Sequence, residues 1–333
     1  MTMETPQPSP NNAVLEVQGL VKHFPVRRGF FQRPIGHIQA VDGVDLALAP
    51  GKTLGLVGES GCGKSTVGRL ILKLLEPDAG RIAFRGEEIS GYTQDEMKPL
   101  RREMQIIFQD PYGSLNPRMT VSQTIEEGLR ITGMKHPQER KDRVLELLHM
   151  VGLAPSAADR YPHEFSGGQR QRVGLARALS VEPSLVICDE PISALDVSIQ
   201  AQIINLLEGL QSRLGLSYLF ISHDLNVVGY MSDTVAVMYL GHIMEVAPAD
   251  ALFDRALHPY TQALLSAVPV ADPDERAEPA TLGGDVPSAY EPPPGCKFQG
   301  RCPLVEDRCK EGKIEMVSVD ADHQVRCWKV TGT

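Results

Sequence analysis

One short segment limits the fold of this chain more than any other. Residues 58–65 read Gly-Glu-Ser-Gly-Cys-Gly-Lys-Ser, which fits the pattern G-x-x-x-x-G-K-[ST]. The segment follows an apolar run over 54–57 and precedes a helical pattern over 66–75. A strand, a glycine-rich turn and a helix in this order predict an α/β fold in which the turn binds an anion.

The residue types in this turn suit a nucleoside triphosphate, ATP or GTP. Glycines let successive backbone N–H groups point at phosphate oxygens, and the helix N-terminus adds partial positive charge. Lys64 can reach the β- and γ-phosphates, and the Ser65 hydroxyl can ligate Mg²⁺. The nucleotide-binding residues that we expect here are Gly58, Glu59, Ser60, Gly61, Cys62, Gly63, Lys64, Ser65 and Thr66.

Apolar runs farther along the chain indicate a parallel sheet. Short apolar stretches at 185–188, 219–222 and 235–238 end at polar residues, as buried parallel strands do. Helical patterns over 122–150 and 170–180 lie between the apolar run at 54–57 and the stretch at 185–188. Strands that alternate with helices predict ligand sites at the carboxyl ends of the strands.

Two carboxylates follow the strand predicted at 185–188. Asp189 is placed to hold Mg²⁺ through water, as the strand next to a phosphate loop requires. Glu190 is the candidate general base for the attacking water. Together with the phosphate loop, the pair predicts nucleotide hydrolysis.

Composition excludes other classes of protein. The 333 residues are 42% hydrophobic, enough for a substantial core. The net charge of −9 argues against nucleic acid as a partner, because a phosphodiester backbone would repel the chain. No stretch reaches the ~18 apolar residues of a membrane-spanning helix. Residues 1–12 lack the basic and apolar regions of a secretory signal, so we expect a cytosolic protein.

The segment Phe165-Ser-Gly-Gly-Gln169 lies directly before the helical pattern of 170–180. A hydroxyl and two glycines at a helix N-terminus form a second anion site. The segment resembles the signature motif of ATP-binding cassette (ABC) proteins, with Phe165 where leucine is usual. The resemblance implies a parallel-sheet nucleotide-binding domain with a helical subdomain, which hydrolyses ATP. It also implies a head-to-tail dimer in which one subunit completes the other's ATP site through Ser166, Gly167, Gly168 and Gln169.

Other positions match the ABC family one by one. Gln109 resembles the Q-loop glutamine, which contacts Mg²⁺ and the water. Residues 193–196 resemble the D-loop, which crosses the dimer interface and ends at Asp196. His223 resembles the switch histidine that contacts the γ-phosphate. The resemblance thus implies catalysis by Glu190, His223 and Gln109, and Mg²⁺ ligation by Ser65, Gln109 and Asp189.

Phe24 sits where the family places an aromatic residue that stacks on adenine. It could instead be an ordinary core residue, and Phe30 or Phe31 could take the stacking role. These alternatives stay open at this point.

Residues 108–118, residues 258–261 and a cysteine-bearing tail resemble the ATP-binding subunits of dipeptide and oligopeptide importers. The resemblance implies a second, paralogous ATP-binding subunit, two transmembrane permease subunits and an extracytoplasmic solute-binding protein as partners. It implies a peripheral location on the cytoplasmic face of the membrane. Nickel and glutathione importers share the architecture, so both stay alternatives, and a soluble non-transport ABC ATPase is a more distant one. His258 is expected to start or pack a helix rather than bind a ligand.

Four of the six cysteines lie near the C-terminus, at Cys296, Cys302, Cys309 and Cys327. Reduced cytosolic thiols make disulfides an unfavourable explanation, whereas four thiolates suit zinc or an iron–sulfur cluster. Peptide-importer subunits with similar tails carry a [4Fe–4S] cluster, which the resemblance implies here. Zinc and unligated structural cysteines are the alternatives. Cys62 and Cys188 are expected to be buried.

The same patterns divide the chain into four segments. We expect a disordered N-terminus over 1–12 and a nucleotide-binding domain over 13–268, with a helical subdomain at about 110–182. A proline-rich linker over 269–294 then leads to a C-terminal cysteine module over 295–333.

Overall fold

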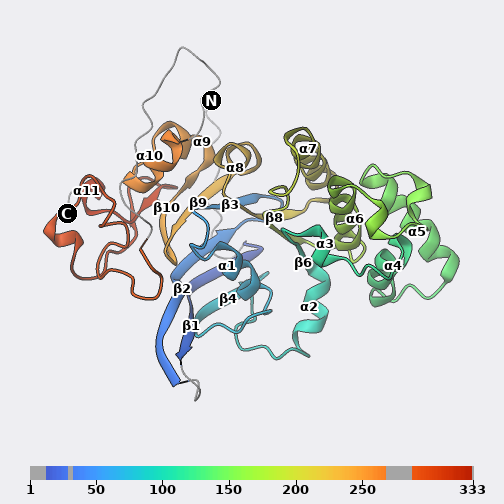
Figure 1. Ribbon diagram of the computed structural model, residues 1–333, viewed down its shortest axis with the longest axis horizontal. Coiled ribbons are helices and arrows are strands. Elements are labelled where there is room, and N and C mark those ends of the chain that lie inside the picture. The colour runs from blue at the N-terminus through green and yellow to red at the C-terminus, as the bar shows by residue number, and fades with distance from the viewer. Residues whose placement is uncertain (1–12, 29–32, 268–286, 332–333) are drawn as a thin grey trace, which may run out of the picture. The chain divides into compact units, whose positions relative to one another are not determined.

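The computed structural model describes residues 13–28, 33–267 and 287–331 (Figure 1). The chain forms two compact parts. The terminal part contains the described residues of 1–49, 53–91 and 221–333, and the middle part contains 50–52 and 92–220. Within the described ranges, no helix combines the length and the apolar character needed to cross a membrane.

The elements alternate between strands and helices through most of the chain. The strands are β1 (Leu15–Arg28), β2 (Arg33–Leu48), β3 (Thr53–Val57), β4 (Ala79–Phe84), β5 (Glu87–Glu88), β6 (Met104–Ile107), β7 (Leu185–Asp189), β8 (Ser217–Ser222), β9 (Thr234–Tyr239), β10 (His242–Pro248), β11 (Val317–Ser318) and β12 (Gln324–Val325). The α-helices are α1 (Lys64–Ile71), α2 (Met97–Glu103), α3 (Pro111–Ser114), α4 (Val121–Ile131), α5 (Pro137–Met150), α6 (Gly167–Leu179), α7 (Val197–Leu214), α8 (Leu225–Met231), α9 (Ala249–Asp254), α10 (Pro259–Ser266) and α11 (Trp328–Thr331). Short 3₁₀ turns are η2 (Pro155–Ala157), η3 (Pro162–Glu164) and η4 (Asp307–Cys309).

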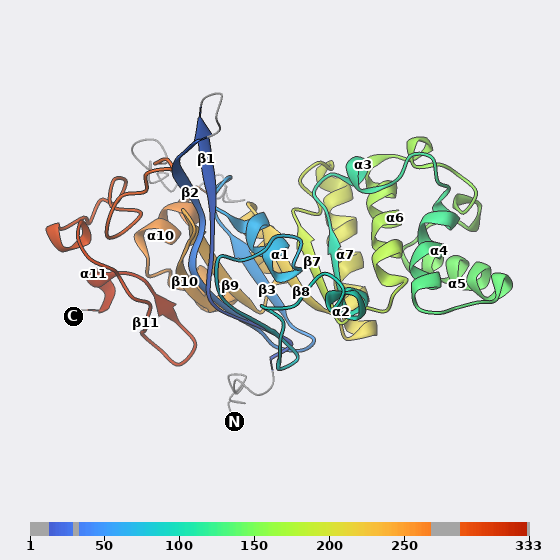
Figure 2. The same cartoon turned by 90° about the horizontal axis from the view of Figure 1, so that it is seen from below.

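The terminal part contains two sets of paired strands. One has the order β2-β1-β4-β5, and its long antiparallel β1–β2 ribbon is visible in Figure 2. The other has the order β11-β12-β10-β9-β3, in which β3 and β9 run parallel. All five residues of β3 are buried, as expected of a strand covered on both faces. The strand therefore gives the loop that follows it a rigid support.

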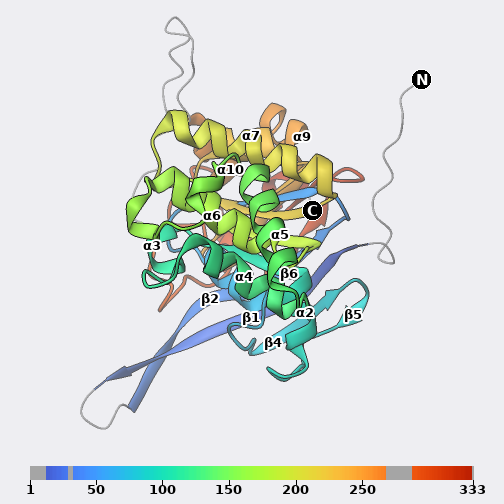
Figure 3. The ribbon, with the colours of Figure 1, turned by 90° about the vertical axis from the view of Figure 1, so that its right-hand side faces the viewer.

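Strands β8, β7 and β6 are neighbours in the middle part, and β6 runs parallel to β7. Figure 3 shows helices α4 to α7 of this part toward the viewer. The helical pattern predicted over 122–150 corresponds to two helices, because α4 ends at Ile131 and α5 begins at Pro137. Gly133 adopts φ +90° in the connection, and a proline fits the first turn of a helix but not its interior.

The strands predicted at 54–57, 185–188, 219–222 and 235–238 are confirmed by β3, β7, β8 and β9. Cys62 and Cys188 are buried, as expected. Helix α1 begins within the phosphate loop at Lys64, and α6 begins at Gly167 in the predicted signature segment. Both helices therefore start at the residues that are expected to contact phosphate.

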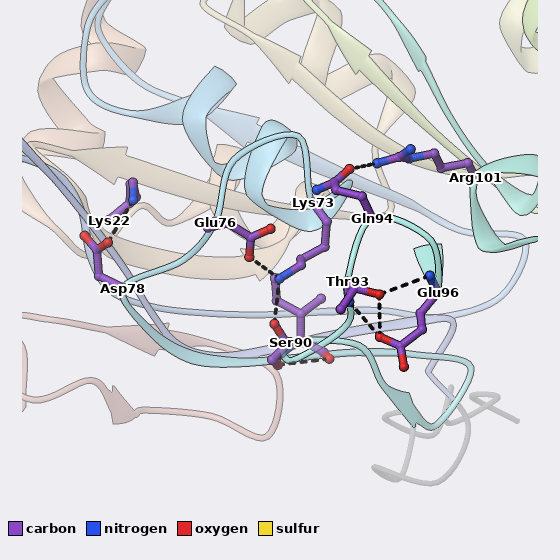
Figure 4. Close-up of polar contacts among 10 residues, drawn as sticks. Lys22, Lys73, Glu76, Asp78, Ser90, Thr93, Gln94, Glu96 and Arg101 are labelled. Atoms are coloured by element: carbon purple, nitrogen blue, oxygen red, sulfur yellow. Dashed lines mark hydrogen bonds and ion pairs between the residues drawn. The ribbon is translucent and has the colours of Figure 1, made fainter. Parts of the chain in front are cut away.

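Polar contacts fix the chain just beyond α1 (Figure 4). Lys73 is buried, and its Nζ pairs with Glu76 and donates to the Ser90 carbonyl at 2.7 Å. Asp78 accepts from Lys22 Nζ at 2.8 Å and from the His23 N–H at 2.6 Å. These bonds tie the chain that follows α1 to β1 and to the β4–β5 hairpin.

A separate C-terminal cysteine module is not confirmed. Strand β12 pairs with β10, with Val325 opposite Glu245. Glu245 is fully buried and accepts from the Leu257 N–H at 2.6 Å and the His258 N–H at 3.0 Å, while His323 Nε2 lies 2.7 Å away. Because an unpaired buried carboxylate would be costly, these bonds hold residues 323–325 against β10 and the start of α10.

The predicted linker over 269–294 can be compared with the structure only from residue 287 onward. There, the Tyr290 hydroxyl donates to the Ile35 carbonyl at 3.0 Å, and the Gln39 N–H donates to the Ala289 carbonyl at 2.9 Å. These residues therefore contact β2. Residues 1–12 and 268–286 lie outside the described residues. The expected disorder of 1–12 and the rest of the expected linker therefore stay predictions.

Candidate active site

The phosphate loop needs glycine at two positions for steric reasons. Gly63 adopts φ +112°, and a Cβ there would lie 2.0 Å from the Ala40 carbonyl oxygen. Gly58 adopts φ +153°, and a Cβ there would lie 2.1 Å from the Met238 carbonyl oxygen. Both separations are far below contact distance, so the loop packs backbone to backbone against β2 and β9.

Lys64 is buried and points back into its own loop. Its Nζ donates to the carbonyls of Gly58 at 2.8 Å and Glu59 at 3.0 Å, and it lies 3.8 Å from Cys62 Sγ. Burial raises the pKa of the Cys62 thiol, so this group stays neutral beside the ammonium. The loop therefore holds one positive charge where its helix begins, which suits a phosphate ligand.

Glu59 is held from three sides by other residues. Its N–H donates to the Tyr260 hydroxyl at 3.0 Å, and its carbonyl accepts from Lys64. Its carboxylate accepts from both terminal nitrogens of Arg301, at 2.7 and 3.0 Å. Sequence reasoning did not assign Tyr260 or Arg301 to the site. No spacing rule could have found them, because they lie 201 and 242 residues beyond Glu59.

The middle part brings together Gln109 and Glu190, the two residues that are expected to take part in catalysis. Parallel pairing places Ile107 of β6 opposite Cys188 of β7. Gln109 and Glu190 each lie two residues beyond this pair, so they leave the sheet at the same level. Gln109 Nε2 donates to Glu190 Oε2 at 2.8 Å. Glu190 adopts φ +48°, an uncommon conformation for a residue other than glycine that often marks functional positions. The buried Asp189 precedes it.

The predicted signature segment caps α6. Ser166 is exposed at the N-cap, where its hydroxyl accepts from the Gln169 N–H at 3.4 Å and its own N–H donates to Gln169 Oε1 at 3.1 Å. A Cβ on Gly168 would lie 2.4 Å from Ile199 Cγ2 of α7, so the glycine permits close packing of α6 on α7. Phe165 is buried.

The remaining predicted site residues lie at element ends or on the β1–β2 ribbon. His223 is exposed between β8 and α8, and Asp196 is exposed at the N-terminus of α7. Phe24 is half-buried on β1 opposite Ile38, and Lys22 Nζ lies 5.7 Å from the centre of its ring. Phe24 is therefore not a fully buried core residue. Phe30 and Phe31 lie outside the described residues.

The four C-terminal cysteines line one pocket, together with His258 and Trp328. Burial, together with a smaller contribution from the nearby thiols, raises the pKa of the Cys296 thiol to about 11. Burial also raises the pKa values of Cys302 and Cys327. His258 caps α10 by accepting the Tyr260 N–H at 3.0 Å, as expected of a helix-start residue. Among the described residues, no three His, Cys, Asp or Glu side chains surround a single point closely enough to hold a metal ion.

Comparison with known proteins decides the family. Residues 41–193 match the family described as ABC transporter, and residues 244–309 match the oligopeptide/dipeptide transporter C-terminal region. The chain is 52% identical over 317 residues to the oligopeptide transport ATP-binding protein AppF of Bacillus subtilis, covering 94% of this chain and 96% of that protein. The chain belongs to the ABC transporter family.

Two further proteins support the assignment of this chain to the ABC transporter family. The oligopeptide transport ATP-binding protein OppF of Salmonella typhimurium is 50% identical over 325 residues, covering 95% of this chain and 96% of that protein. The ATP-binding cassette MJ0796, solved as a dimer in a post-hydrolysis state bound to ADP and Pi, aligns with a TM-score of 0.63 and 28% identity. That alignment covers 71% of this chain and 98% of MJ0796. The ABC fold and the resemblance stated above are confirmed, and the protein is an ATPase of the transport-coupled ABC type.

Proposed function

We propose that this ABC protein is the ATP-hydrolysing subunit of an importer for dipeptides and oligopeptides. The match over residues 244–309 carries the proposal, because it lies outside the ABC match at 41–193 and bears the name of peptide transporters. The relatives named above are also described as oligopeptide transport proteins. These observations favour peptides over nickel or glutathione as the transported solute.

In the proposed reaction, Ser65, Gln109 and Asp189 would hold Mg²⁺, which would supply neutralisation of charge on the phosphates. Lys64 would bind the β- and γ-phosphates, and Glu190 would accept the proton of the attacking water. Gln109 already donates to Glu190 at 2.8 Å, so it would orient the carboxylate and the water. His223 would contact the γ-phosphate, and Phe24 would stack on adenine.

We further propose that ATP closes a dimer with a second, paralogous ATP-binding subunit. Ser166 to Gln169 of one subunit would complete the partner's site, with Asp196 at the interface, and closure would exclude bulk water. Exposure supports this proposal, because Ser166 and Asp196 are accessible and the side chain of Val197 is 81% exposed.

Closure would move two separate transmembrane permease subunits, which receive the solute from an extracytoplasmic binding protein. The ABC protein would therefore act peripherally, at the cytoplasmic face of the membrane. Residues 108–118 are proposed to contact the permeases. Within them, the Gly113 N–H donates to Asp110 Oδ2 at 3.1 Å, which gives the segment a defined turn.

Uptake measurements in cells test the transported solute. A strain that lacks this chain is expected to lose uptake of labelled dipeptides and oligopeptides, while its uptake of nickel and glutathione is retained. Restoring the wild-type chain should restore peptide uptake. The peptide assignment would be contradicted if nickel or glutathione uptake were lost instead, with peptide uptake intact.

We also propose that the cysteine pocket holds a [4Fe–4S] cluster. Four thiols facing one pocket are the donor set of such a cluster. In such a cluster each of the four thiolates would bind one iron.

Protein purified without oxygen is expected to contain about four iron atoms and four acid-labile sulfides per chain. Cys302→Ala should lose most of the iron, because one ligand is removed. The matched control Cys188→Ala should retain it, because Cys188 lies within β7. Full-length protein with no iron, or with about one zinc and no sulfide, would contradict the cluster.

A further inference from the structure

Arg301 is the only ion-pair partner that the structure gives Glu59 within the described residues. The two side chains form a bidentate pair, with nitrogen–oxygen distances of 2.7 and 3.0 Å. The side chain of Arg301 is 7% exposed and that of Glu59 is 24% exposed. Bidentate arginine–carboxylate bonds of this kind are short, directional and poorly screened when they are shielded from water.

A carboxylate in a phosphate loop opposes the loop's ligand. Glu59 lies next to Gly58 and five residues before Lys64, and a bound triphosphate would bring several negative charges into the same loop. Like charges at short range repel, most strongly where water is excluded. Arg301 counters this effect in two ways, since it neutralises the carboxylate and fixes the direction in which it points.

Tyr260 and Tyr239 support the same contact from a buried aromatic cluster. The rings of Tyr239, Tyr260 and Phe298 lie within 5.4 Å of one another, centre to centre, and Phe298 stands three residues before Arg301. The Tyr239 hydroxyl lies 3.4 Å from an Arg301 nitrogen, and the Tyr260 hydroxyl accepts the Glu59 N–H. Arg301 is thus held by packed side chains rather than by a free loop.

We propose that Arg301 is a positioning residue for the phosphate loop, which couples the cysteine-bearing segment of the chain to its affinity for ATP. The proposal rests on the proposed function only in requiring that the loop binds ATP. Arg301 acts through Glu59 and is not assigned a contact with the nucleotide. Because Cys302 follows it directly, the fold of the cysteine segment sets where the guanidinium stands.

A double-mutant cycle on the full-length protein separates positioning from a general structural role. The variants are Arg301→Gln, Glu59→Gln and their combination. Each is titrated with MgATP by calorimetry, on ice so that no ATP is turned over. Arg301→Gln is expected to raise the Kd for MgATP about tenfold, equivalent to about 1.4 kcal/mol, with kcat at saturating ATP unchanged. Arg301→Lys should recover part of the affinity, because it keeps the charge and loses the bidentate geometry.

In the Glu59→Gln background, adding Arg301→Gln is expected to change the Kd less than about twofold, because no carboxylate remains to be neutralised. Arg308→Gln is the matched control, since Arg308 also precedes a cysteine but pairs with Glu306 at the surface. It should bind MgATP as the wild type does.

Three results would overturn the proposal. The first is an equal loss of affinity in the Glu59→Gln background, which would make Arg301 a structural residue only. The second is wild-type affinity in Arg301→Gln, and the third is the same loss in Arg308→Gln. If Arg301→Gln does not fold, Arg301→Lys replaces it in the cycle. Failure of the wild-type protein to bind MgATP would instead contradict the proposed function.

Discussion

Glu190→Gln is expected to lower kcat for ATP hydrolysis at least about a hundredfold, which is the usual effect of losing a general base. Glutamine cannot accept the proton of the attacking water. Its amide oxygen can still accept from Gln109 Nε2, which now donates to Glu190 at 2.8 Å, so the local geometry is retained. ATP should therefore bind normally and accumulate in a closed dimer. Phosphate release measures hydrolysis. The Kd for MgATP measures binding, and the mass from light scattering measures dimer formation.

Glu182→Gln is the control for this substitution. Glu182 is also in the middle part and also adopts a positive φ, +57°, but its exposed carboxylate pairs with Arg143. The Glu182→Gln variant should hydrolyse ATP at the wild-type rate, because surface ion pairs contribute little to the stability of a fold. A Glu190→Gln enzyme with nearly wild-type kcat would remove Glu190 from the mechanism.

Ser166→Asp is expected to abolish ATP-driven dimerisation and to lower hydrolysis at least about a hundredfold, since it places a negative charge where the partner's γ-phosphate would bind. Aspartate is as good an N-cap as serine, so α6 should remain intact. The subunit's own phosphate loop should still bind MgATP. Sedimentation with and without MgATP reports dimerisation, and thermal unfolding reports the stability of the fold.

Ser166→Asn provides the neutral comparison, because asparagine also caps helices well. It should dimerise with ATP and lose far less activity than the aspartate variant. If both variants hydrolysed ATP equally well, or if monomeric wild-type chains did so at full rate, the signature segment would have no role in a partner's site.

Many residues of the candidate site could be predicted because each group of them is consecutive in the sequence. The phosphate loop, the strand that ends at Asp189 and the cap at Ser166 each depend on a few neighbours along the chain. The resemblance assigned Gln109 and Glu190 catalytic roles but did not predict their contact, for which the register of β6 on β7 supplies the physical reason. Local patterns therefore account for most of the residues predicted for the ATP site.

Two features could not be predicted from local apolar spacing. The connection between α4 and α5 lies between Gly133 and Pro137, whereas apolar spacing continues on both sides of it. The packing of the C-terminal residues was not visible in any local pattern. It depends on Glu245, His323 and Phe298, whose contacts join segments far apart in the sequence.

The bond between Glu59 and Arg301 also has a consequence for the order of events during synthesis. The two residues are 242 positions apart, and ribosomes add roughly 5–20 residues per second, so Glu59 leaves the ribosome on the order of ten seconds before its partner exists. Throughout that interval the carboxylate has no arginine beside it. The proposed role of Arg301 therefore places full nucleotide affinity near the end of translation, after residue 301 has been added.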